Sequence, residues 1–195
     1  LILGMFQPDI NVCWDLAPHD ISIVNYLLNR FPVSVNCQGQ SHYKKGIEDV
    51  TNMSINYGDG IIAFVTSSWL DPNKLRTTTI VGSKKMRVYD DIQPQEKIKI
   101  FDKGVNAPSY YDTFGDFQFS YRYGDILIPR VEDYEPLKKQ DGHFIECIEQ
   151  AKVPRSDGYS GLKVVTVLEA ASRSLKKDGR AVPVFCPERR PHSLP

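Results

Sequence analysis

A carboxylate and an imidazole stand four residues apart near the start of the chain, in the stretch Trp14-Asp15-Leu16-Ala17-Pro18-His19-Asp20. Residues at i and i+4 lie on the same side of a helix, so Asp15 and His19 share a face if this stretch is helical. Histidine is the side chain most readily poised to move a proton near neutral pH, and a nearby carboxylate orients it and raises its basicity. The spacing therefore predicts acid–base chemistry. The structural alternative is that Asp15 caps a helix and His19 is an ordinary polar residue.

An amphipathic helix is predicted to position this pair. From Ile21 onward apolar residues recur at helical spacing, namely Ile21, Val24, Leu28 and Phe31, with Ile23 and Leu27 beside them. Pro18 suits the first turn, because proline already has the helical φ and its missing N–H is not needed there. Asp15 and Asp20 would then lie near the positive end of the helix dipole.

Composition bounds the class of protein. The chain has 195 residues, 41% of them hydrophobic, which suits one domain with a real core. Lys plus Arg equals Asp plus Glu at 24 each, so no bulk positive field indicates nucleic acid or an anionic membrane as partner. The four cysteines are scattered without a CxxC pair, and we find no signal peptide or membrane span, so we expect a reduced, cytoplasmic protein. The chain begins in mid-pattern, which suggests that the natural polypeptide starts earlier.

The middle of the chain alternates in character as strands do. Gly58-Asp59-Gly60 is a strong turn signal between two such runs and predicts a hairpin. Strands joined by short turns must run antiparallel. An aromatic face is predicted for one later strand, made of Phe117, Phe119, Tyr121 and Tyr123. Strands are expected at 33–37, 53–57, 61–65, 77–81, 86–89, 97–101, 117–123 and 126–128.

Two further helices are predicted near the end. One begins near Pro136 with its buried side marked by Leu137, Phe144, Ile145 and Ile148. The other runs over about 160–177 and stops before Gly179, with a stripe of Leu162, Val165, Leu168 and Ala171. The fold class is therefore α+β, with an open, mostly antiparallel sheet of about six or more strands and the three helices on one face. We expect one domain over 1–184 and an irregular tail over 185–195.

Other constellations have weaker chemical meaning. His143 and Cys147 stand at i and i+4 and could bind a metal, but no second pair supplies the remaining ligands. Basic residues at Lys74, Arg76, Lys84, Lys85 and Arg87 could grip a phosphate, although solvated charge is the commoner explanation. Trp69 ends a strand and could form a pocket wall or part of the core. No nucleophile elbow, Walker loop or G-x-G-x-x-G is present.

Three groups of residues, in this order, resemble the C-terminal half of the Gfo/Idh/MocA oxidoreductases, named for glucose-fructose oxidoreductase and inositol dehydrogenase. They are Asp15 to Ile23, then Ser68 to Arg76 with Ile80 to Lys84, then Glu135-Pro136-Leu137 with His143-Phe144-Ile145. Members of that family have an N-terminal Rossmann domain that holds NAD(P) and a C-terminal domain that binds substrate and often mediates oligomerisation. The resemblance covers nearly the whole chain to Val184, and implies that only the second domain is present here.

Carried over by the resemblance, the family's D-x-x-x-H motif falls on Asp15 and His19. His19 would be the general base that removes a hydroxyl proton while hydride leaves the same carbon, and Asp15 would be its partner. The pattern looks like members that act on sugars or nucleotide sugars. Candidates for substrate contact are Trp14, Asp20, Trp69, Lys74 and Arg76. NAD or NADP would be needed by the full-length protein, with none expected on this chain alone.

Three functions remain open at this point. The favoured one is the substrate-binding, catalytic half of an NAD(P)-dependent dehydrogenase of a sugar or nucleotide sugar, forming a homo-oligomer through its free sheet face. The second is a non-enzymatic sugar-binding or oligomerisation module without a cofactor domain. The third is a metal-dependent hydrolase built on Asp15, His19 and Asp20, which lacks a credible set of further ligands.

Overall fold

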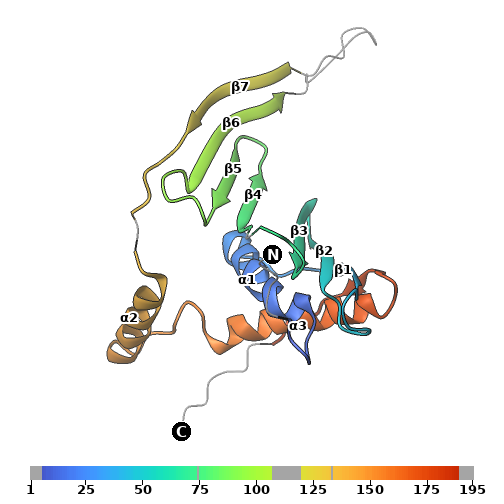
Figure 1. Cartoon of the computed structure of the whole chain (residues 1–195). Helices are drawn as coiled ribbons and strands as arrows, with labels where there is room; N and C mark the ends of the chain where they lie inside the picture. The colour runs from blue at the N-terminus through green and yellow to red at the C-terminus, as the bar shows by residue number, and fades with distance from the viewer. Residues whose placement is uncertain (1–5, 74, 107–119, 133, 189–195) are drawn as a thin grey trace. The chain divides into compact units, whose positions relative to one another are not determined.

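A computed structural model describes residues 6–73, 75–106, 120–132 and 134–188. The chain forms two compact units, one of residues 1–73 with 143–195 and the other of residues 74–142. The span 1–184, predicted as a single domain, includes residues of both units. No helix among the described residues is long and apolar enough to cross a membrane. The elements follow in the order α1 (Val12–Leu28), β1 (Ser34–Gln40), β2 (Val50–Gly58), β3 (Ile61–Ser68), β4 (Thr77–Val81), β5 (Met86–Asp90), β6 (Ile98–Asn106), β7 (Ser120–Leu127), α2 (Pro136–Glu149), α3 (Gly158–Leu175) and β8 (Val182–Pro183) (Figure 1).

The first unit is built on a four-stranded antiparallel sheet, sheet A, in the order β3-β2-β1-β8. The strands alternate buried and exposed side chains, so that Val35, Met53 and Ile55 point to one face. Helices α1 and α3 pack on this sheet and on each other. The contact buries one contiguous core, which includes Cys13, Ala17, Ile21, Cys37, Val65, Val167, Leu168, Ala170 and Ala171. The predicted hairpin turn is confirmed, with positive φ at Gly58, Asp59 and Gly60.

The second unit contains another antiparallel sheet, sheet C, in the order β4-β5-β6-β7. None of its described side chains is buried within the chain. Lys103 lies over the rings of both Phe101 and Tyr123, at 5.7 and 5.8 Å from the centroids, so these residues share one face of the sheet. On that face Tyr123 is 76% exposed and the neighbouring Tyr121 63%. Phe117 and Phe119, the other half of the predicted aromatic row, lie outside the described residues.

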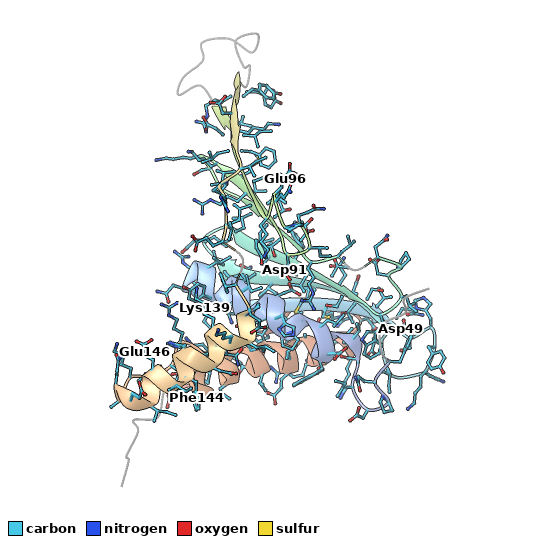
Figure 2. All side chains as sticks on the ribbon, turned by 60° about the vertical axis from the view of Figure 1, so that its left-hand side comes forward. Asp49, Asp91, Glu96, Lys139, Phe144 and Glu146 are labelled. Carbon is cyan, nitrogen blue, oxygen red and sulfur yellow. The ribbon has the colours of Figure 1, made fainter. Side chains whose placement is uncertain are left out.

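The α+β class and the antiparallel pairing predicted from the sequence are confirmed, but three details were wrong. The strands form two sheets of four instead of one sheet of six or more. The stripe predicted to be buried on α2 is 55% to 66% exposed at Leu137, Phe144, Ile145 and Ile148. Figure 2 labels Phe144 on this helix. On α3 the first part of the stripe, Leu162 and Val165, is exposed, while Leu168 and Ala171 are buried. Periodicity identifies the apolar side of a helix without determining what covers it.

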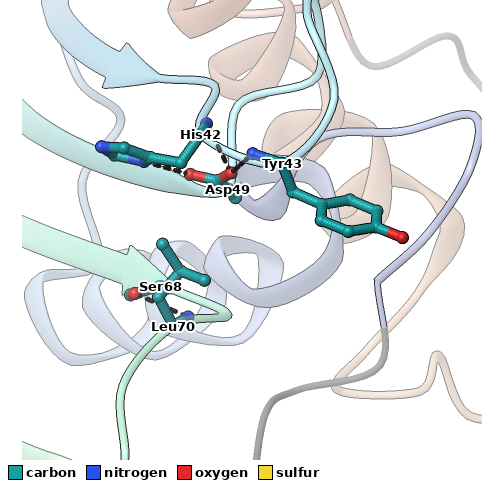
Figure 3. A network of polar contacts seen from close by, with 5 residues as sticks. All are labelled: His42, Tyr43, Asp49, Ser68 and Leu70. Atoms are coloured by element: carbon teal, nitrogen blue, oxygen red, sulfur yellow. Dashed lines mark hydrogen bonds and ion pairs between the residues drawn. The ribbon is translucent and has the colours of Figure 1, made fainter.

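A buried carboxylate closes the loop between β1 and β2 (Figure 3). The side chain of Asp49 is 1% exposed. Its Oδ2 accepts hydrogen bonds from the backbone N–H groups of His42 and Tyr43, at 2.7 and 2.8 Å, and its Oδ1 lies 2.8 Å from His42 Nδ1. Burial by itself would raise the pKa of the Asp49 carboxyl, but these hydrogen bonds to the charged form outweigh burial and hold the pKa below its usual value.

We expect Asp49→Asn to lower the free energy of unfolding near pH 7 by about 1–3 kcal/mol, because it weakens hydrogen bonds to a buried charged group. A carboxyl whose pKa is lowered by folding stabilises the protein above its unfolded pKa, and this contribution disappears as the pH falls through the folded pKa. The difference between variant and wild type should therefore shrink below about pH 4. Urea unfolding from pH 3 to 8 measures it.

The matched control is Asp59→Asn, which changes an aspartate whose side chain is 81% exposed in the turn between β2 and β3. The free energy of unfolding of this control should match that of the wild type across this pH range. Equal stability of Asp49→Asn and wild type at pH 7, or a difference that persists unchanged at pH 3, would contradict the assigned role.

Candidate active site

Helix α1 begins earlier than the sequence predicts, because Asn11 caps it. The Asn11 side chain accepts a hydrogen bond from the backbone N–H of Trp14 at 3.2 Å. The loop before β2 holds the same end: the Val12 N–H donates to the Glu48 carbonyl at 2.9 Å, and Asn11 Nδ2 donates to Glu48 Oε2 at 2.8 Å. The predicted place of Pro18 in the first turn was wrong, since Pro18 lies inside the helix. Asp15 lies in the first turn but does not cap it.

Asp15 is held from the far end of β3. The indole Nε1–H of Trp69 donates to Asp15 Oδ2 at 2.8 Å, across 54 residues of sequence. Trp69 is 2% exposed, which favours the core alternative over a pocket wall. Its backbone N–H donates to the Asp49 carbonyl at 3.0 Å, and the ring of Phe6 packs 5.3 Å from its own. One oxygen of the Asp15 carboxylate is therefore fixed by a buried donor.

His19 is exposed one turn further along α1, and no hydrogen bond or ion pair to it is found among the described residues. A helix places residues i and i+4 on one side, so Asp15 and His19 share a side as the spacing predicts. The neighbouring Asp20 is half-buried. The arrangement combines a fixed carboxylate with an accessible imidazole, which is suited to moving a proton at a ligand's hydroxyl group.

The other candidates for substrate contact are spread over different parts of the fold. The Trp14 indole N–H donates to Ser172 Oγ at 2.8 Å and ties α1 to α3. Arg76 belongs to the second unit, where its guanidinium lies 3.5 Å from the Asp91 carboxylate. Tyr89 donates to the same carboxylate at 2.7 Å, and this bond and Arg76 lower the pKa of Asp91. Lys74 lies outside the described residues.

No group of three or more His, Cys, Asp or Glu side chains that could hold a metal is found in the described part of the chain. His143 and Cys147 do approach each other on α2, with the sulfur 3.6 Å from Nε2. That nitrogen also accepts a hydrogen bond from the backbone N–H of Arg155 at 3.2 Å. The imidazole is thus engaged in a local turn contact.

Sequence reasoning missed the residues that support the pair. Asn11 carried a usable signal, since asparagine is a favoured N-cap residue and stands just before an apolar helical stripe. Asp49 and the contact between Trp69 and Asp15 carried none, because both depend on how distant strands and loops meet in space.

Comparison with known proteins finds a family match over part of the chain. Residues 8–87 match the family described as the GFO/IDH/MocA C-terminal domain, and this match contains Asp15, His19 and Trp69. No curated protein sequence matches the chain.

Solved structures share the fold at low sequence identity. UDP-N-acetylglucosamine 3-dehydrogenase from Acidithiobacillus ferrooxidans aligns with a TM-score of 0.68 and 17% identity, over 91% of this chain and 52% of its own. Aldose-aldose oxidoreductase from Caulobacter crescentus, complexed with glycerol, gives 0.67 and 19%, over 93% and 52%. The WlbA dehydrogenase from Bordetella pertussis, in complex with NADH and UDP-GlcNAcA, gives 0.63 and 18%, over 91% and 46%.

The chain thus spans about half the length of these structures, with 52%, 52% and 46% of them covered. The sequence match thus concerns residues 8–87, and the solved structures, at 17% to 19% identity, show a likeness of fold over most of the chain.

Proposed function

We propose that this chain is the substrate-binding and catalytic half of an NAD(P)-dependent oxidoreductase. The observation that carries the proposal is the pair on α1: Asp15 is fixed by a buried indole, and His19 is exposed beside it without a partner among the described residues. This pair lies within the segment that matches the GFO/IDH/MocA C-terminal domain.

His19 is the general base in this proposal. A ring nitrogen of His19 takes the proton of a substrate hydroxyl group as the carbon that bears it is oxidised to a carbonyl. The Asp15 carboxylate lies on the same side of α1, one turn before the histidine. The exposure of His19 supports this role, because a general base must come within hydrogen-bond distance of the proton it removes.

The substrate class is a sugar or a nucleotide sugar. The solved structures with this fold include a UDP-N-acetylglucosamine dehydrogenase and an oxidoreductase of aldoses. A hydroxyl group on a sugar ring is the kind of group on which a histidine base can act. Among the predicted contacts, Asp20 stays a candidate because it follows His19 directly on α1.

NAD(P), when bound, would supply the hydride acceptor for this oxidation, and the sequence of this chain lacks the motif that would bind its pyrophosphate. A pyrophosphate is bound by a glycine-rich turn that leads from a strand into a helix N-terminus. The chain contains no G-x-G-x-x-G, and Gly58 and Gly60 belong to the hairpin between β2 and β3. We therefore assign no residue of this chain to NAD(P) and place its binding in a Rossmann half outside this chain.

The exposed face of sheet C is the proposed contact between copies of the protein. One face of this sheet is not covered by any described residue of the same unit. It carries Phe101, Lys103 and Tyr123, with Tyr121 beside them. An exposed apolar and aromatic surface of this kind is typical of subunit interfaces.

We predict that His19→Ala lowers kcat by about 10²- to 10⁴-fold in an enzyme that joins this chain to a dinucleotide-binding half, because the proton acceptor is lost. Reduction of NAD or NADP with UDP-N-acetylglucosamine and with free aldoses measures it. Ser22→Ala changes an exposed polar residue of the same helix and should leave kcat unchanged. Wild-type turnover in His19→Ala would remove His19 from the mechanism.

For the chain by itself, we expect no saturable binding of NAD or NADP in the micromolar range, since its sequence contains no G-x-G-x-x-G to receive the pyrophosphate. Calorimetric titration with both dinucleotides tests this. Micromolar binding would mean that the cofactor site lies within residues 1–195 after all.

A dimer or larger assembly at micromolar concentration is the expected state of the chain in solution. Tyr123→Glu introduces a charge on the proposed contact face and should shift the mass measured by light scattering toward the monomer. The control is Tyr26→Glu on α1, at a site that is 70% exposed and belongs to the other unit. A wild-type protein that is monomeric at this concentration would refute the pairing.

A further inference from the structure

Trp69 is held by several contacts near the proposed site. It follows directly after β3, whose last residue Ser68 pairs with Val50 of β2. The Ser68 hydroxyl accepts a hydrogen bond from the Leu70 N–H at 3.0 Å, which turns the chain immediately after Trp69 (Figure 3). With its backbone N–H bonded to the Asp49 carbonyl and its side chain 2% exposed, the indole has little freedom to rotate.

The single donor of this indole is directed at Asp15. An indole Nε1–H donates only one hydrogen bond, and at 2.8 Å from Oδ2 this bond is fully formed. It occupies one direction of Oδ2, and no hydrogen bond to Oδ1 is found among the described residues. His19 has no comparable restraint.

We propose that Trp69 is a positioning residue, which fixes the Asp15 carboxylate while His19 stays free to meet the substrate. This inference rests on the proposed function of Asp15 and His19. A carboxylate on the first turn of a helix rotates about two side-chain torsions, and a preformed bond to a rigid ring removes that freedom before the substrate arrives. Such preorganisation contributes to the rate because groups already in place lose less entropy in the transition state.

The chain offers a matched control in Tyr57. This tyrosine is also buried, at 4% exposure, and its hydroxyl donates to Asn25 Oδ1 of the same helix α1 at 2.9 Å. Trp69→Phe and Tyr57→Phe therefore each remove one buried aromatic donor to α1 and keep an aromatic ring in the core. Only the first touches Asp15.

In the enzyme that joins this chain to a dinucleotide-binding half, we expect Trp69→Phe to lower kcat by about 10-fold or more, with KM changed much less. Tyr57→Phe should retain wild-type kcat. In a background that carries Asp15→Ala, Trp69→Phe should cause no further loss, because the group it positions is gone. An equal loss in both backgrounds, or wild-type kcat in Trp69→Phe, would overturn the inference.

A second measurement uses this chain alone and keeps Trp69 intact. The two tryptophans give two indole N–H signals in an NMR spectrum. Asp15→Ala should move the Trp69 signal and speed its hydrogen exchange, and should affect the Trp14 signal less because that indole is bonded to Ser172. An unmoved Trp69 signal would overturn the inference. Normal turnover in His19→Ala is a different outcome, since it removes the proposed function while the NMR result still reports on the bond.

Discussion

The packing of α1 and α3 onto one face of sheet A is the contact on which the rest of the first unit depends. Small side chains at Ala170 and Ala171 allow α3 to approach β1 closely, and both are fully buried. Ser174 then satisfies the polar backbone at the contact, since its hydroxyl accepts from the Cys37 N–H at 2.8 Å and donates to the Arg180 carbonyl at 2.7 Å. A buried polar group without such partners would cost about 1–3 kcal/mol. Close approach and full hydrogen bonding are therefore achieved together.

The two sides of helix α1 have different roles, one in the core and one at the proposed site. One side buries Cys13, Ala17 and Ile21 in the core, and the other presents Asp15 and His19. Pro18 lies between the two residues of the proposed catalytic pair and has no N–H to donate to the carbonyl of Trp14, one turn earlier. The helix is held regardless, because its first turn is capped by Asn11 and bonded to Glu48, and the Trp14 indole is bonded to α3. Contacts outside the helix thus compensate for a residue that weakens it.

Local sequence patterns predicted most helices and strands, but they did not predict the contacts between distant segments. Alternation and turn residues predicted β4 over 77–81 with its observed bounds, and the helical stripe at Ile21 identified a buried face. The start of α1 predicted near Pro18 is wrong, because the cap at Asn11 determines where the helix begins. The bond between Trp69 and Asp15 was out of reach, since nothing near either residue in the sequence indicates the other. The division into two sheets could not be predicted for the same reason, because strands pair with partners from distant parts of the chain.

The strand β8 has a consequence for how sheet A can grow. It consists of two residues, Val182 and Pro183, and pairs with the outer side of β1. A proline cannot donate to a neighbouring strand, and an edge this short offers almost no template for one. At the opposite edge, β3 is eight residues long and carries exposed Ile62 and Phe64. Among the described strands, sheet A therefore has two unlike edges: β3 offers a long row of backbone groups that a further strand could pair with, whereas β8 offers almost none.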